Sequence, residues 1–196
     1  EAFKELFFHI PADEKPEYNG TQLINSAVIV RYLKQLLKQD IRYAPFQYVG
    51  SEKVVSEKVT IHTPSGDFQS RIGGFIDRLD SKDDILRIVD YKTGGSPDMP
   101  PSVESLFIPD KKRSGYVFQT FLYASIVSKM QNLKVSPSLL YIHKAASEDY
   151  SPVICLKEGK SGTEPVTDFS IYEEEFREAL QKLLDEIFHP DIHFTQ

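Results

Sequence analysis

The order of helical and extended patterns along the chain predicts an α/β protein with a central mixed β-sheet flanked by helices. Apolar residues at helical spacing follow Gly20, whereas residues 54–91 have the pattern of strands joined by tight turns. A second helical segment then separates these strands from further ones. Strands that alternate with helices in this way typically form a sheet whose faces are covered by the helices.

Helices are expected in four places. A short helix over residues 1–8 is followed by a longer one that starts after Gly20-Thr21. The later helices span about Ser114–Met130 and Tyr172–Phe188. The second helix carries apolar residues at helical spacing, namely Leu23, Ala27, Val30, Leu33 and Leu37.

The expected strands are joined by short turns in the first half of the chain. The turn Pro64-Ser65-Gly66 joins the first two strands, and the polar tetrad Ser81–Asp84 joins the second to the third. A long Pro-rich loop over Gly94–Arg113 precedes the third helix. The strands themselves span about Glu57–His62, Phe68–Leu79, Ile85–Tyr91, Ser138–His143 and Val153–Leu156.

Composition restricts the class of protein. A chain of 196 residues with 40% hydrophobic and 27% charged residues fits one soluble globular domain over residues 1–196. No apolar run is long enough for a bilayer span and no signal pattern opens the chain, so no membrane partner is expected. The lone Cys155 excludes an internal disulfide and a cysteine-rich metal site, and a cytoplasmic protein is expected. The net charge of −6 argues against a broad nucleic-acid-coating face, but not against an enzyme with a local basic groove.

Two aspartates and a lysine close two adjacent expected strands. Asp90 and Lys92 are two residues apart, so a strand places them on one face. Asp77 closes the preceding apolar strand, and the Ser81–Asp84 turn can bring it near Asp90. Two carboxylates suit a hard cation such as Mg²⁺, and a neighbouring lysine can orient or deprotonate water or balance charge on a phosphate. The alternative is an ordinary hairpin with a surface ion pair.

These segments resemble a known family. Gly74–Asp80 reads GFIDRLD, and Ile88–Gly94 reads IVDYKTG. Gln119 and Tyr123 follow on the next helix at i and i+4, so they share a helical face. The set resembles the PD-(D/E)xK nuclease superfamily, and most closely the RecB/AddB-type nuclease domain of recombination helicases. The alternative for Gln119 and Tyr123 is a helix that merely packs on the sheet.

The resemblance implies a restriction-endonuclease-like fold that hydrolyses phosphodiester bonds in DNA with Mg²⁺ or Mn²⁺. By position it implies Asp77 and Asp90 as metal ligands, with the Tyr91 carbonyl as a third, and Lys92 as the catalytic lysine. Gln119 and Tyr123 would then support the substrate or the lysine. We expect an exonuclease of DNA repair and recombination whose partners are DNA and a helicase domain or subunit. The rival is a catalytically inactive nuclease-fold module that binds DNA or braces a helicase.

The chain departs from the family pattern at both ends, so we expect a fragment of a longer protein. The G-x-x-x-H motif that supplies a histidine ligand is missing, and His9 is a poor substitute. An iron–sulfur cluster is expected only in a longer parent chain, beyond the cysteine-free ending at Gln196. With one ligand fewer, the isolated chain should bind metal weakly; Glu5 and Glu57 are the other candidates for a third ligand.

Two further groups of charged residues are open to more than one interpretation. Arg78 follows Asp77 on the opposite face, and a structural ion pair with Asp80 or a helix acid is favoured. The run Lys111–Arg113 could contact phosphates or could be a solvated loop.

Overall fold

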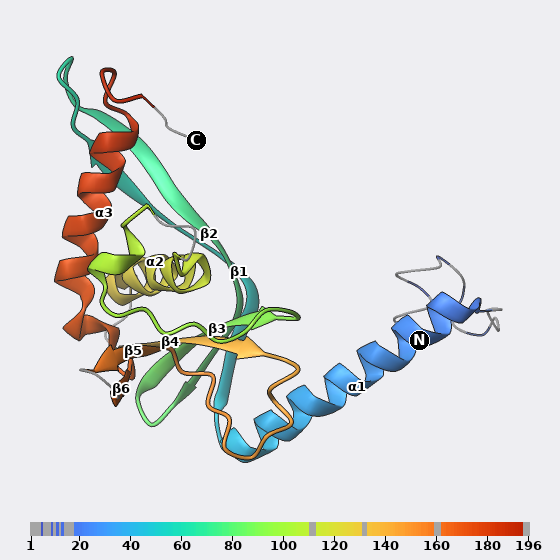
Figure 1. Cartoon of the computed structure of the whole chain (residues 1–196). Helices are drawn as coiled ribbons and strands as arrows, with labels where there is room; N and C mark the ends of the chain where they lie inside the picture. The colour runs from blue at the N-terminus through green and yellow to red at the C-terminus, as the bar shows by residue number, and fades with distance from the viewer. Residues whose placement is uncertain are drawn as a thin grey trace.

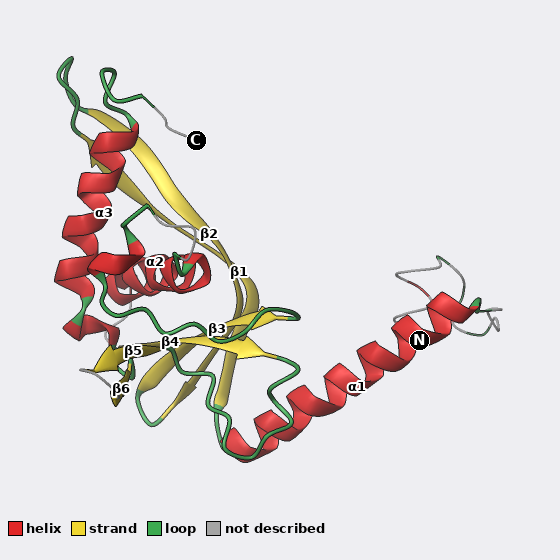
Figure 2. Ribbon diagram, viewed as in Figure 1, coloured by secondary structure: helices red, strands yellow, loops and turns green. Residues whose placement is uncertain are grey.

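The computed structural model describes residues 5, 9, 11, 13, 18–109, 113–130, 133–158 and 162–193. Its body is a four-stranded sheet with helices on both faces, and one long helix projects from it (Figures 1 and 2). The helices are α1 (Gly20–Tyr43), α2 (Gly115–Met130) and α3 (Glu173–Ile187), with short 3-10 turns at Glu104–Leu106 and Phe169–Ile171. The strands are β1 (Gln47–Ile61), β2 (Phe68–Lys82), β3 (Ile85–Lys92), β4 (Lys134–Tyr141), β5 (Cys155–Glu158) and β6 (Gly162–Pro165).

The main sheet is mixed, as the sequence predicts. Its order is β1-β2-β3-β4, with antiparallel pairing from β1 to β3 and parallel pairing between β3 and β4. Helix α2 makes the crossover that a parallel connection requires. Strands β1 and β2 form a long ribbon, and α3 runs beside its far half (Figure 1). The Gln181 side chain of α3 donates to the Thr60 carbonyl there at 2.8 Å.

The two faces of the sheet have different partners. On one face, α2 packs on Leu79, Leu86 and Ile88, and α3 packs on α2 and β1, around a cluster of buried phenylalanines. On the other face, Tyr32 and Leu36 of α1 pack on a smaller buried group. Because side chains alternate along a strand, even-numbered residues of β3 from Leu86 to Lys92 face α2.

Several expected elements differ from the structure. Strand β1 begins at Gln47 rather than Glu57, because much of its first half is exposed and shows no buried alternation. The strand expected at Val153–Leu156 is predicted in the wrong position, because β5 runs over Cys155–Glu158. Val153 forms only an isolated bridge to Ser138, and β5 pairs with the unpredicted β6 in a separate small sheet. The helix predicted over residues 1–8 lies outside the described residues, apart from Glu5.

The apolar stripe of α1 is exposed rather than buried. Its spacing correctly predicts the helix, but the N-terminal part of α1 projects from the body, as Figure 2 shows. Apolar spacing reports which residues share a helical face, and it does not report whether anything covers that face. Among the stripe residues, Leu23, Val30, Leu33 and Leu37 are exposed.

Candidate active site

Asp77 lies where β2 and β3 part. The last paired residues at this end are Arg78 and Val89, so Asp77 and Asp90 are the next positions outward on the two strands. The Oδ2 atom of Asp77 accepts a 2.8 Å hydrogen bond from the backbone N–H of Tyr91. This bond ties the Asp77 carboxylate to the residue that follows Asp90, so the two aspartates meet at this end of the strands.

Asp90 is a buried carboxylate beside a half-buried ammonium. Only 5% of Asp90 is exposed, and its Oδ2 forms an ion pair with Lys92 Nζ. Burial raises the pKa of Asp90, the contact with Lys92 lowers it, and the charge of Asp77 raises it further. The balance is a raised pKa, because removal from water and a like-charged neighbour both penalise the charged carboxylate.

This pair of carboxylates fits a divalent cation. Asp90 Oδ2 is buried, and its partner within the described part of the chain is the Lys92 ammonium. A cation would satisfy that oxygen and relieve the repulsion between Asp77 and Asp90. The described residues contain no group of three or more His, Cys, Asp or Glu side chains that could hold a metal. An ion bound here would therefore use two carboxylates, a main-chain oxygen such as that of Tyr91, and water, a ligand set that suits Mg²⁺.

Helix α2 presents Tyr123 toward β2, with Gln119 bonded to it. The Gln119 Nε2 donates to the Tyr123 hydroxyl at 2.9 Å. Tyr123 is 5% exposed, and its ring lies on Gly74 so closely that a Cβ there would fall 2.5 Å from the hydroxyl oxygen. Gly74 thus makes room for Tyr123, which gives this glycine of the motif a packing reason.

One contact of the lysine was not anticipated from the sequence. Lys92 Nζ lies 3.9 Å from the centroid of the Tyr116 ring. Tyr116 precedes Gln119 by three residues and Tyr123 by seven, so the three share one stripe of α2. That spacing is visible in the sequence, but the contact itself depends on how α2 crosses the end of β3.

A hollow of about 740 Å³ opens beside the site. It lies between the loop that follows β3 and the start of α2, and its volume is in the range of ligand-binding clefts. Tyr116 and Gln119 belong to its wall, and Tyr116 also contacts Lys92, so the hollow lies next to the lysine of the site. Exposed Arg113 adds a positive charge to it, while Lys111 and Lys112 lie outside the described residues. The remaining lining residues are Gly95, Ser96, Pro97, Asp98, Ser114, Gly115, Val117 and Tyr141.

The other candidate metal ligands do not lie next to Asp77 and Asp90. Glu57 forms ion pairs with Lys129 Nζ at 2.6 Å and with Arg177 Nη1 at 3.2 Å, which tie β1 to α2 and α3. Its interpretation as a third ligand is therefore wrong in this structure, because both its partners are structural cations. Glu5 and His9 are exposed, and no contact joins either to the carboxylates among the described residues.

The second aspartate of the motif serves the back face of the sheet. Asp80 is fully buried and accepts two 2.8 Å hydrogen bonds from Arg87. Arg78 lies 2.8 Å from Asp80 and 2.9 Å from Asp40 of α1, which confirms the predicted structural role of Arg78. The Asp80–Arg87 pair was missed, although counting back from the Asp83-Asp84 turn would have placed the two opposite each other.

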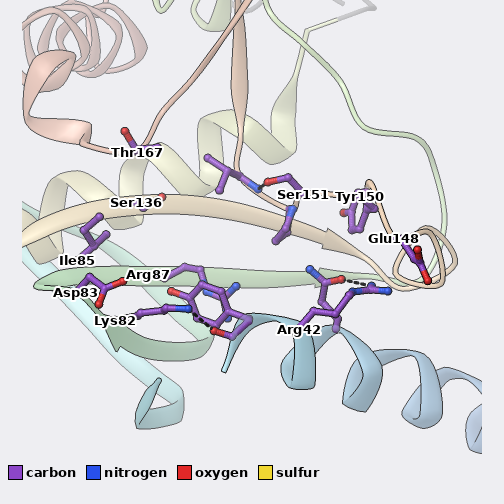
Figure 3. A pocket seen from close by; sticks show the side chains of 14 residues that line it. Arg42, Lys82, Asp83, Ile85, Arg87, Ser136, Glu148, Tyr150, Ser151 and Thr167 are labelled. Atoms are coloured by element: carbon purple, nitrogen blue, oxygen red, sulfur yellow. Dashed lines mark hydrogen bonds between the residues drawn. The ribbon is translucent and has the colours of Figure 1, made fainter. Parts of the chain in front are cut away.

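A second pocket, of about 390 Å³, lies on this back face (Figure 3). Its cations are already bound within the protein. Lys82 Nζ donates to the Tyr43 carbonyl at 2.7 Å, Arg42 binds the Ala145 carbonyl at 2.6 Å, and Arg87 is held by Asp80. The pocket is therefore separate from the carboxylate pair, which faces α2.

The comparison with protein families agrees with this geometry. The family model of the PD-(D/E)XK nuclease superfamily matches residues 1–196. The chain belongs to this superfamily, whose members are nucleases that generally use divalent metal ions such as Mg²⁺. A search of curated proteins found no match. Within the described parts of the chain, no helix is long and apolar enough to cross a membrane.

Proposed function

We propose that the chain is a Mg²⁺- or Mn²⁺-dependent deoxyribonuclease whose active site is built on Asp77, Asp90 and Lys92. The observation that carries the proposal is the meeting of two carboxylates at the parting of β2 and β3, one of them tied to Tyr91 N–H at 2.8 Å. Lys92 stands beside them as the neighbouring cation. A bare structural ion pair would need one carboxylate, and this arrangement has two.

Each residue has a distinct task in the proposed reaction. Asp77 and Asp90 would hold the cation, with the Tyr91 carbonyl as a further ligand, and the bound ion supplies a Lewis acid for phosphodiester hydrolysis. Lys92 Nζ would orient the attacking water and balance the charge that develops on the phosphate. Its low exposure strengthens this effect, because charges interact more strongly away from bulk water.

Gln119 and Tyr123 would act on the substrate side of the site. The Gln119 amide nitrogen donates to the Tyr123 hydroxyl, and Gln119 also lines the hollow. A DNA strand in the hollow would pass Gln119 before it reaches the carboxylates. We therefore assign to Gln119 the positioning of the strand.

The motifs also suggest a biological context for the activity. Motifs that resemble those of RecB/AddB-type domains support an exonuclease that acts at DNA ends in repair and recombination, next to a helicase domain or subunit. Among the described residues, the charged ones that line the hollow are Arg113 and Asp98, and the absence of a net positive charge from them suits a domain to which a partner delivers DNA.

A cleavage assay separates the proposal from its rival. Wild type, Asp90→Asn and the control Asp84→Asn would be incubated with end-labelled linear DNA and with closed circular DNA, in Mg²⁺, Mn²⁺ or EDTA. Asp84 is an exposed turn carboxylate at φ 60°, a conformation that asparagine tolerates. We expect metal-dependent degradation of linear DNA by wild type and the control, and none by Asp90→Asn. Binding of DNA by wild type without cleavage in either metal would favour the inactive module.

A further inference from the structure

The ammonium of Lys92 has two partners in the described structure, and one of them is the oxygen that a cation would need. Its Nζ pairs with Asp90 Oδ2 and lies 3.9 Å from the centre of the Tyr116 ring. This Asp90 oxygen is buried, and Lys92 is its partner in the ion pair. A divalent cation and the Lys92 ammonium compete for this oxygen. Binding of the ion therefore weakens the ion pair between Asp90 and Lys92.

The ring of Tyr116 does not take part in this competition. Cations bind the face of an aromatic ring through its quadrupole, and they do so at distances up to about 6 Å from the centroid. The contact at 3.9 Å is well inside that range. The contact with the ring does not involve the Asp90 carboxylate, which therefore stays available to a metal ion. The ion pair with Lys92, by contrast, uses that carboxylate.

Contacts at the start of α2 hold the backbone of Tyr116 in place. The neighbouring Val117 is fully buried, and the Thr120 hydroxyl donates to the Tyr116 carbonyl at 2.8 Å. The Ser114 hydroxyl bonds to Asp98 in the loop after β3. The Tyr116 side chain itself is 52% exposed, so replacing it changes little of the core.

We propose that Tyr116 is a positioning residue of the active site, which holds the Lys92 ammonium over its ring while Asp90 binds the divalent ion. This inference rests on the proposed nuclease function and adds a residue to it. Without the ring, the ammonium would be free to swing away from the phosphate once the Asp90 oxygen is engaged.

The kinetic test compares a variant that loses the ring with one that keeps it. In single-turnover assays on linear DNA with Mg²⁺, Tyr116→Leu should cleave about tenfold more slowly, the factor expected for losing one cation–π contact at a partly exposed site. DNA binding should change by no more than about twofold, since the effect acts through Lys92. Tyr116→Phe keeps the aromatic face and should recover most of the lost rate.

A double-mutant cycle identifies the residue through which Tyr116 acts. In a Lys92→Met background, Tyr116→Leu should cause no further loss, because the ammonium that the ring holds is gone. The same tenfold loss in that background, or an effect confined to DNA affinity, would instead mean that Tyr116 contacts DNA directly and would overturn the inference. A Tyr116→Phe variant that cleaves as slowly as Tyr116→Leu would also overturn the inference.

An NMR measurement tests the contact without any turnover. The ε-methylene protons of Lys92 should be shifted upfield in wild type relative to Tyr116→Leu, and the shift should persist when Mg²⁺ is added. Its disappearance on adding Mg²⁺ would refute the holding role. A wild-type protein that cleaves no DNA would refute the proposed function itself, whereas an active wild type with an unaffected Tyr116→Leu variant would refute this inference alone.

Discussion

Replacing Asp80 should cost far more stability than replacing Asp77, although the two lie three residues apart in one motif. Asp80 is fully buried and binds both Arg78 and Arg87, which are 8% and 4% exposed. Together with Asp40 these groups form a cluster of two positive and two negative charges. Asp80→Ala leaves one buried positive charge in excess, and removing one partner of a buried pair typically costs about 3–5 kcal/mol.

Asp77 makes only one hydrogen bond in the described structure, to the Tyr91 N–H. The amide oxygen of Asp77→Asn can accept the same bond, and the substitution removes the repulsion with Asp90. Its effect on the free energy of unfolding should therefore stay within about 1 kcal/mol. Its effect on cleavage should be large, because an amide is a poor ligand for a hard cation.

The assay is urea unfolding of wild type, Asp80→Ala, Asp80→Asn and Asp77→Asn, followed by circular dichroism, with cleavage measured on the same preparations. Asp80→Asn keeps the shape of the side chain and serves if the alanine variant does not fold. The expected pattern is low stability for the Asp80 variants, and near-normal stability without cleavage for Asp77→Asn. The reasoning fails if Asp80→Ala unfolds within about 1 kcal/mol of wild type, since the buried cluster would then contribute almost nothing.

Three further predictions follow from single contacts. Lys92→Met keeps the apolar stem and should fold, but cleavage by this variant should fall by about 10²-fold, and near-normal rates in Mg²⁺ would remove Lys92 from the mechanism. Gly74→Ala should displace Tyr123, whose hydroxyl would lie 2.5 Å from the new Cβ, and lower the free energy of unfolding by about 1–3 kcal/mol in thermal melts. The control Gly20→Ala, with no atom within 4 Å of its Cβ, should change it little. Burial raises the pKa of the Cys155 thiol, so iodoacetamide at pH 7.5 should alkylate folded protein more slowly than urea-unfolded protein, and equal rates would contradict the described burial.

The site could be predicted from sequence where local rules decide the geometry. Alternation along β3 places Asp90 and Lys92 on one face, and helical spacing places Gln119 with Tyr123. A turn within Ser81–Asp84 is expected to bring Asp77 near Asp90, although it leaves the register open. In the structure β2 continues to Lys82, the turn is Asp83-Asp84, and the register carries Asp77 to Asp90. These expectations agree with the structure, whereas the roles of the residues as ligands and catalysts stay predictions.

Other features could not be predicted because they depend on long-range packing. The contact of Tyr116 with Lys92 requires the crossing of α2 over the end of β3. The pairing of Glu57 with Lys129 and Arg177 requires the placement of α3 beside the β1–β2 ribbon. The exposure of the α1 stripe is likewise invisible in the spacing of Leu33 and its neighbours, since periodicity is the same in a covered and an uncovered helix.

The central claim is that Asp77 and Asp90 bind one divalent cation between them. Anomalous diffraction from crystals grown with Mn²⁺ tests it most directly, because the signal locates the ion without reference to activity. The account predicts one strong peak with an oxygen of each carboxylate at about 2.1 Å, the usual distance for a small divalent cation. A Mn²⁺ peak that touches only one of these carboxylates, or that lies elsewhere on the protein while the pair stays bare, would contradict the account.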